Sequence, residues 1–368
     1  MYKYSYRPYT SGDENSINDL YAKITGRIRS KAAYFWQWQN APGGKGEVWV
    51  IEAELPNGQK MLIGHHGIMP VRFSYGQDDL LFGKTENTFV HPDFRSKILY
   101  PRFERRFAYH YENRFHALFS TLGPRAAIRQ RQAQGYVSEH LWKTYIWGLR
   151  PLSDIYYLIS YYSKRYNKSA EMFIPVVKNE SDSYTRLPGI NIRCYNDHDA
   201  LFIDFFRTFW SSVKRSYPVT PSRYHEDLKW RFWDNPYISY QSLILDSELY
   251  GSAMAVISNT VPGTIRVDDF IVEHPKSKSF RLLFEALITW ARMHGAYRVI
   301  FTTTSDSVDW VGHESLQLQP NFSFARRIYD IFAKSDVRMP RKICTNGQVF
   351  GITCSNWFVT SMIFEGIS

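Results

Sequence analysis

Residues 86–107 hold the side chains whose order points most directly to chemistry. Residues 87–90 read as a strand, and the basic turn Arg95-Ser96-Lys97 follows them closely. An amphipathic helix is expected after the turn, because Phe103 and Phe107 are four residues apart and share a helix face. A strand, a basic turn and a helix N-terminus together offer backbone N–H groups and a positive dipole to a pyrophosphate.

This segment resembles motif A of the GNAT superfamily of acyl-CoA N-acyltransferases, a strand and helix joined by V-x-P-x-x-[RQ]-x-x-G-x-[GA]. Val90, Pro92 and Arg95 match the motif, whereas Ile98 and Tyr100 stand where the family has small residues. The resemblance implies that the backbone of Phe89 and Val90 faces the thioester. It also implies that the coenzyme A pyrophosphate is held by Arg95, Ser96, Lys97, Ile98, Leu99 and Tyr100.

A second stretch, residues 127–136 (AIRQRQAQGY), resembles the late helix and following strand of the same family, A-I-R-x-Y-x-x-x-G-[FY]. Arg131 replaces the tyrosine that protonates the departing thiolate in many members. The resemblance therefore assigns Arg131 to the thiolate or a phosphate, and an ordinary exposed helical arginine is the alternative.

Acyl transfer to an amine needs a group that removes the amine proton. Glu86 and Asn87 point to opposite faces of the expected strand, and Glu86 is the best carboxylate for the general base. A solvated or salt-bridged carboxylate is an equal alternative. His65 is a second candidate base, or else a structural histidine, and its neighbour His66 points the other way, so no metal site is expected.

Length and composition set the class of protein. The 368 residues fit two domains, and 44% hydrophobic residues suffice to fill both cores. The net charge of +10 favours polyanionic partners. The arginines are densest at 102–106 and 125–131, but no run of five like charges occurs. Three scattered cysteines argue against a disulfide scaffold. Without a run of about eighteen apolar residues, no transmembrane segment is expected, and a cytoplasmic location is predicted.

The expected order of strands and helices resembles that of a GNAT domain, and the resemblance implies an α/β (α+β) protein of two tandem GNAT-like domains. Each would be a mixed, mostly antiparallel sheet flanked by helices. We expect an N-terminal domain at 1–150 with the acyl-CoA site, a connector at 151–188 and a degenerate copy at 189–368. In the first domain separate strands are expected at 60–68, 69–75 and 80–84.

The second half echoes the first in the same order, which argues for duplication. Residues 35–38 (FWQW) are echoed by 230–233 (WRFW), and Val90-His91-Pro92 by Val272-Glu273-His274-Pro275. Asp268-Asp269 lie near the position that corresponds to Glu86-Asn87. In the second copy the turn lacks both the glycine and the arginine of the motif.

The resemblance implies an N-acyltransferase that moves an acyl group, most simply acetyl, from acyl-CoA to an amine. An amino sugar or an amino-acid-like metabolite of polysaccharide or secondary-metabolite biosynthesis is the expected acceptor. Two alternatives stay open: an aminoacyl-tRNA-dependent, Fem-like transferase, and a non-catalytic module that binds coenzyme A or another ligand. Nucleic acid is expected as a partner only under the first alternative.

Overall fold

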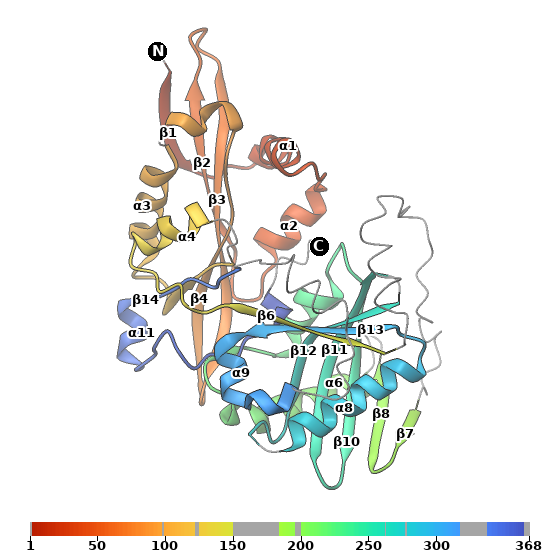
Figure 1. Ribbon diagram of the computed structural model, residues 1–368. Helices are drawn as coiled ribbons and strands as arrows, with labels where there is room; N and C mark the ends of the chain where they lie inside the picture. Colours follow the sequence, from red (N-terminus) through yellow and green to blue (C-terminus); the bar gives the residue numbers. More distant parts are fainter. Residues whose placement is uncertain are drawn as a thin grey trace.

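The computed structural model describes residues 2–97, 99–121, 125–149, 184–195, 200–261, 263–276, 278–316 and 337–363. Ile98 and most of the expected connector, residues 151–183, lie outside these ranges. Two seven-stranded sheets with helices on both faces make up the molecule, one above the other in Figure 1. The two predicted mixed, mostly antiparallel sheets flanked by helices are thus confirmed. Within the described ranges no helix is long and apolar enough to cross a membrane.

The first sheet has the order β1-β2-β3-β4-β5-β14, and β9 pairs with β3 off this path. Helices α1 and α2 lie on one face of it, and α3 and α4 lie on the other (Figure 1). The elements up to residue 149 are β1 (Lys3–Pro8), α1 (Asp13–Thr25), α2 (Lys31–Gln39), β2 (Glu47–Glu54), β3 (Lys60–Tyr75), β4 (Asp78–Val90), the 3-10 turn η1 (Pro92–Lys97), α3 (Leu99–Tyr111), β5 (Ala117–Phe119), α4 (Arg125–Gln132) and β6 (Trp142–Gly148).

The second sheet has the order β6-β13-β12-β11-β10-β8-β7. Its edge strand β7 falls inside the expected connector. The elements from residue 184 onward are β7 (Tyr184–Leu187), β8 (Ile190–Tyr195), α6 (Ala200–Val213), η2 (Lys214–Ser216), β9 (Thr220–Pro221), α7 (His225–Leu228), η3 (Lys229–Trp233), β10 (Tyr240–Ser247), β11 (Gly251–Val261), β12 (Thr264–Val272), α8 (Lys278–Met293), β13 (Arg298–Thr304), α9 (Ser305–Val311), η4 (His313–Leu316), β14 (Arg341–Ile343), α11 (Thr345–Val349) and η5 (Ser361–Ile363).

The two sheets repeat one topology and exchange a strand. In each sheet a parallel pair, β4 with β5 or β12 with β13, interrupts an otherwise antiparallel arrangement. The strand beside β5 is β14, from the end of the chain, whereas β6, from the first 150 residues, pairs with β13. Strands therefore cross the expected boundary at residue 150 in both directions. The ranges 1–150 and 189–368 remain a prediction about folding units.

Local sequence explains where the first helices begin and end. Helix α1 carries Asp13 and Glu14 in its first turn and ends at Gly26, whose positive φ of 72° suits glycine. The Ser30 side chain caps α2 by accepting a hydrogen bond from the Ala33 N–H at 3.1 Å. The strand break expected after residue 68 is absent, since β3 pairs with β4 on both sides of it.

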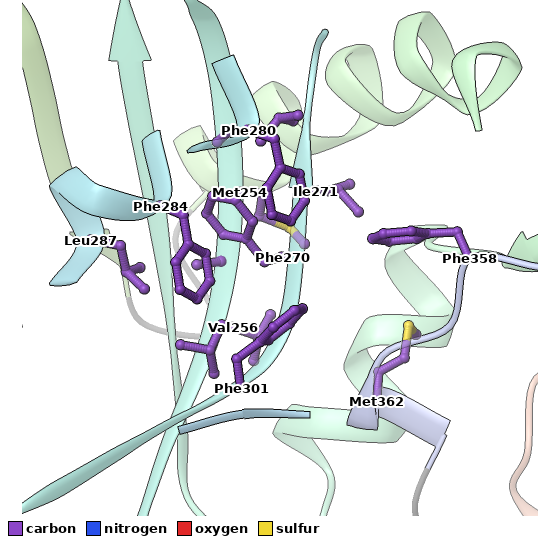
Figure 2. Close-up of a cluster of buried hydrophobic side chains, with 14 of the residues drawn as sticks. Met254, Val256, Phe270, Ile271, Phe280, Phe284, Leu287, Phe301, Phe358 and Met362 are labelled. Carbon is purple, nitrogen blue, oxygen red and sulfur yellow. The ribbon is translucent and has the colours of Figure 1, made fainter. Parts of the chain in front are cut away.

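The core of the second half lies on both faces of its sheet. Figure 2 places Phe280 and Phe284 of α8 on one side of the strands, with Phe358 on the other. Phe270 of β12 meets both α8 rings edge-on, with ring centroids 5.1 and 4.8 Å apart. The C-terminal segment that carries Phe358 thus packs as part of this core.

Two tryptophans join the halves through an approximately symmetric contact. The indoles of Trp36 and Trp230 stack with centroids 5.4 Å apart. Trp36 Nε1 donates to the Trp230 carbonyl at 2.8 Å, and Trp230 Nε1 donates to the Trp36 carbonyl at 2.9 Å. The two echoed tryptophan segments therefore meet each other directly.

Replacing Trp230 with phenylalanine is expected to lower the free energy of unfolding by about 1–2 kcal/mol, because the buried Trp36 carbonyl loses its donor. Urea denaturation measures this change. Trp233→Phe is the matched control, since Trp233 Nε1 has no hydrogen-bond partner in the described ranges. Equal losses in the two variants would contradict a role for the reciprocal hydrogen bonds.

Candidate active site

Strands β4 and β5 separate in the middle of the first sheet. They pair in parallel only from Phe82 to Lys84, and β4 then continues to Val90. Asn87 has a positive φ of 50° at a bulge in the pairing with β3. The Thr85 hydroxyl donates to the Phe119 carbonyl at 3.3 Å, where the strands diverge. The gap and the bulge turn part of the β4 backbone away from regular pairing, which suits recognition of a ligand by backbone groups.

The expected pyrophosphate cradle begins with a 3-10 turn and continues into α3. Residues 92–97 form η1, and Leu99 starts α3. Arg95 is exposed, and its Nε donates to the Val90 carbonyl at 3.2 Å, which ties the turn to the end of β4. Leu99 is buried in a cluster with Phe103 and anchors the helix start. Ser96, Lys97 and Tyr100 are described as backbone only, and Ile98 lies outside the described residues.

Glu86 lies on the α2 face of β4 and is buried. Gln37 Nε2 of α2 donates to Glu86 Oε2 at 2.8 Å, and Lys84 Nζ forms an ion pair with Glu86 Oε1. Arg29 extends the chain by donating to Gln37 Oε1 at 3.1 Å. The sequence allowed Glu86 to be a general base or a solvated or salt-bridged carboxylate. In the structure it is a salt-bridged carboxylate next to the bulge at Asn87.

His65 lies on the same face as Glu86 and is fully buried. Its Nδ1 lies 2.7 Å from the Asn87 carbonyl, so Nδ1 carries the proton of the neutral ring. The ring stacks on Phe89, with centroids 4.9 Å apart. Burial lowers the pKa of His65 to about 3, and the nearby Arg29 charge acts in the same direction. His65 is therefore neutral at physiological pH and fixes the bulge.

The stability of the protein is expected to fall as the pH drops from about 6.5 towards 3. The unfolded chain takes up a proton at the ordinary histidine pKa near 6.5, whereas folded His65 stays neutral. One such group contributes a slope of about 1.4 kcal/mol per pH unit. In His65→Phe the free energy of unfolding, measured by urea denaturation between pH 5 and 7, should depend less on pH. A slope in His65→Phe equal to that of the wild type would contradict this role.

Arg131 lies on the opposite face of the sheet from Glu86 and is buried. It forms an ion pair with Glu104 of α3, and its Nη2 donates to the Thr85 hydroxyl at 2.8 Å. His66 Nε2 lies 3.2 Å from the same Glu104 carboxylate, and burial lowers the pKa of His66. Arg131 is thus not an exposed helical arginine, and its guanidinium reaches the point where β4 and β5 diverge.

The second half contains a counterpart of the Glu86 site. Asp269 lies six residues before Pro275, as Glu86 does before Pro92. Arg223 donates to both Asp269 oxygens, at 2.6 and 2.9 Å, and both side chains are fully buried. The Thr360 hydroxyl adds a third hydrogen bond to Asp269, at 2.7 Å. Three hydrogen bonds therefore hold the Asp269 carboxylate, whereas one hydrogen bond and one ion pair hold that of Glu86.

The sequence contains a signal for this counterpart. Arg29 lies seven residues before Trp36, and Arg223 lies seven residues before Trp230. The two arginines therefore occupy equivalent positions in the repeat. In the first copy Gln37 stands between the arginine and the carboxylate, and Lys84 supplies the ion pair.

A small cavity of about 30 Å³ lies where the halves meet beside Lys84. Its volume is enough for about one water molecule. Arg72 and Trp230 line it, together with Asp227, whose pKa burial raises to about 7 although Arg72 donates to it at 2.9 Å. Residues of both halves thus approach the Glu86 side of β4. Within the described ranges no group of three or more His, Cys, Asp or Glu side chains is placed to hold a metal ion.

No family model and no curated protein matches the sequence. Solved structures do match the fold. A conserved protein of unknown function from Enterococcus faecalis V583, titled a probable N-acyltransferase, superposes with a TM-score of 0.58 at 10% identity, over 95% of this chain and 74% of its own. A GCN5-related N-acetyltransferase from Anabaena variabilis gives a TM-score of 0.56 at 10% identity, over 93% and 73%.

The chain has the GNAT fold. Saccharomyces cerevisiae N-myristoyltransferase with bound myristoyl-CoA also superposes, with a TM-score of 0.50 at 12% identity, over 92% of this chain and 78% of that one. Because these similarities cover nearly the whole chain, both sheets belong to the matched GNAT architecture. The fold predicted from the motifs at 86–107 and 127–136 is confirmed.

Proposed function

We propose that the protein is an acyl-CoA-dependent N-acyltransferase that acts on a small amine. The observation that carries the proposal is the divergence of β4 from β5 beside the bulge at Asn87. Among the proteins of similar fold are a GCN5-related N-acetyltransferase and an N-myristoyltransferase with bound myristoyl-CoA. Acetyl is the simplest acyl group, and an amino sugar or an amino-acid-like amine is the proposed acceptor.

In the proposed reaction the amine nitrogen bonds to the thioester carbonyl carbon and gives a proton to Glu86. The carbon–sulfur bond then breaks, and the sulfur leaves with the electron pair as the thiolate of coenzyme A. Glu86 then releases its proton to solvent and the thiolate takes one up from solvent, which leaves the amide and the free thiol of coenzyme A. The backbone of Phe89 and Val90 at the end of β4 would face the carbonyl oxygen, and Arg95 would face the pyrophosphate.

Arg131 is proposed to act on the sulfur side of the site. Its guanidinium reaches the divergence of the strands, and a cation there stabilises a thiolate. The ion pair with Glu104 holds the guanidinium in place. Arg131 thus stands at the position of the tyrosine in the family motif. It would stabilise the thiolate with its positive charge, where the tyrosine would donate a proton.

One observation favours a second candidate, a module that binds acyl-CoA without turnover. Both Glu86 oxygens already have internal partners, namely Gln37 and Lys84. A base must release at least one of these contacts before it can accept a proton from a substrate. If the ion pair between Glu86 and Lys84 never opens, the protein still binds coenzyme A but does not catalyse the transfer.

A thiol-release assay separates the two candidates. The full-length protein is incubated with acetyl-CoA or longer acyl-CoAs and a panel of amino sugars and amino acids, and free thiol is measured with a chromogenic disulfide. Amine-dependent thiol release is the result expected for the transferase. Binding of acyl-CoA without release on any amine would favour the second candidate, and no binding of any acyl-CoA would overturn both.

A further inference from the structure

The outer face of α4 carries a basic hollow, formed by Arg125, Ile128, Arg129, Gln132 and Arg338. Its volume is about 320 Å³, and none of the described residues that line it is a carboxylate. The four residues from α4 lie three and four positions apart, so they share one face of the helix. Such a volume is at the lower end of small-molecule sites in proteins.

The wall opposite α4 is held in a fixed position. The backbone of Arg338 forms an isolated antiparallel β-bridge with Leu141. Arg338 Nη1 donates to the Ser138 carbonyl at 3.1 Å. Gln132 Nε2 donates to the Ser138 hydroxyl at 2.5 Å, which ties α4 to the same segment. The buried side chain of Ile128 forms the apolar base. The hollow is therefore built from two elements that hydrogen bonds hold together.

The two exposed arginines of α4 that line the hollow, Arg125 and Arg129, lack counter-charges within the described ranges. Arg131, the third arginine of α4, turns inward to Glu104. Arg125 and Arg129 are exposed, and neither has an acidic or hydrogen-bonding side-chain partner within the described ranges. Like charges four residues apart weaken a helix, and Arg125 opposes the helix dipole in a first turn without an acidic residue. A bound anion would relieve both effects.

We propose that the basic hollow binds the phosphate group of a small ligand. Guanidinium groups match phosphate because they donate two parallel hydrogen bonds to it. The phosphate comes either from the 3′-phosphate of coenzyme A or from a separate phosphorylated molecule. The proposal does not require acyl transfer, since phosphate binding can be measured without an acyl group.

Isothermal titration of the full-length protein with inorganic pyrophosphate at low ionic strength tests the proposal. Arg125→Gln and Arg129→Gln are each expected to weaken binding about tenfold. The matched control Arg292→Gln, at an exposed position on α8, should bind as the wild type does. All the substituted side chains are exposed, and the melting temperature of each variant checks the fold.

Titration with coenzyme A and with 3′-dephospho-coenzyme A distinguishes the two sources. If Arg129→Gln weakens binding of coenzyme A but not of the dephosphorylated form, the hollow takes the 3′-phosphate. If it weakens only pyrophosphate, the ligand is a separate phosphorylated molecule. Unchanged pyrophosphate binding in Arg125→Gln and Arg129→Gln, or an equal loss in Arg292→Gln, overturns the proposal. If only Arg95→Glu loses pyrophosphate binding, the proposal is also overturned, because the phosphate then binds at the turn before α3.

Discussion

Glu86→Gln is expected to lower kcat by about 10²- to 10⁴-fold, the usual contribution of a positioned general base. The amide keeps the shape of the side chain and its contact with Gln37, but it does not accept a proton. The KM for acyl-CoA should change little, because Glu86 lies on the face of β4 opposite Arg131 and Thr85. Steady-state kinetics with the best amine found by thiol release give both constants.

The loss of charge at Glu86 also leaves Lys84 without its buried ion pair, so stability has to be controlled. Kinetics are therefore compared only at temperatures where circular dichroism finds both proteins folded. Glu52→Gln is the matched control, because Glu52 is another paired carboxylate of the same sheet, on β2, bonded to Arg7 at 2.8 Å. A folded Glu86→Gln protein with kcat within threefold of the Glu52→Gln value would exclude Glu86 as the base.

Asp269→Asn is expected to lower the free energy of unfolding by about 3–5 kcal/mol, because it leaves the fully buried Arg223 without its counter-charge. Trp210 and Phe358 flank the guanidinium, with ring centroids 5.4 and 5.9 Å away, so the charge cannot reach water without disturbing the core. Urea denaturation followed by fluorescence and circular dichroism measures the loss. Coincident transitions by the two probes would justify the free-energy comparison.

Two further variants make this prediction specific to the buried pair. Glu285→Gln removes an exposed ion pair with Arg281, and such pairs contribute only about 0.3–0.5 kcal/mol. The double variant Arg223→Met with Asp269→Leu removes both charges and should recover much of the loss. If Asp269→Asn loses no more than Glu285→Gln, the pair does not have the structural role described.

The motifs in the sequence predicted the fold because each is local. Phe103 and Phe107 are buried as their spacing requires. The order of the echoed segments predicted two copies of one architecture, and the two sheets have similar strand orders. The exchange of β6 and β14 could not be predicted, because no local pattern says which of two equivalent sheet edges a strand joins.

The candidate site was predictable in part. The place of Glu86 on the strand before Pro92 was predicted, but the bulge at Asn87 and the ion pair with Lys84 depend on the surrounding fold. The buried pairing of Arg131 with Glu104 was missed, because Glu104 belongs to a different helix and its spacing gives no signal. The equal spacing of Arg29 and Arg223 before their tryptophans is a signal in the sequence for the second buried pair.

Calorimetric titration of the full-length protein with acetyl-CoA and longer acyl-CoAs tests the central claim most directly. The account predicts saturable binding that Arg95→Glu abolishes and that the control Arg292→Glu leaves unchanged, since Arg95 lies in the turn between β4 and α3. If no acyl-CoA binds, the proposed function is contradicted. If Arg95→Glu binds acyl-CoA as tightly as the wild type, the assignment of the pyrophosphate to residues 95–100 is contradicted.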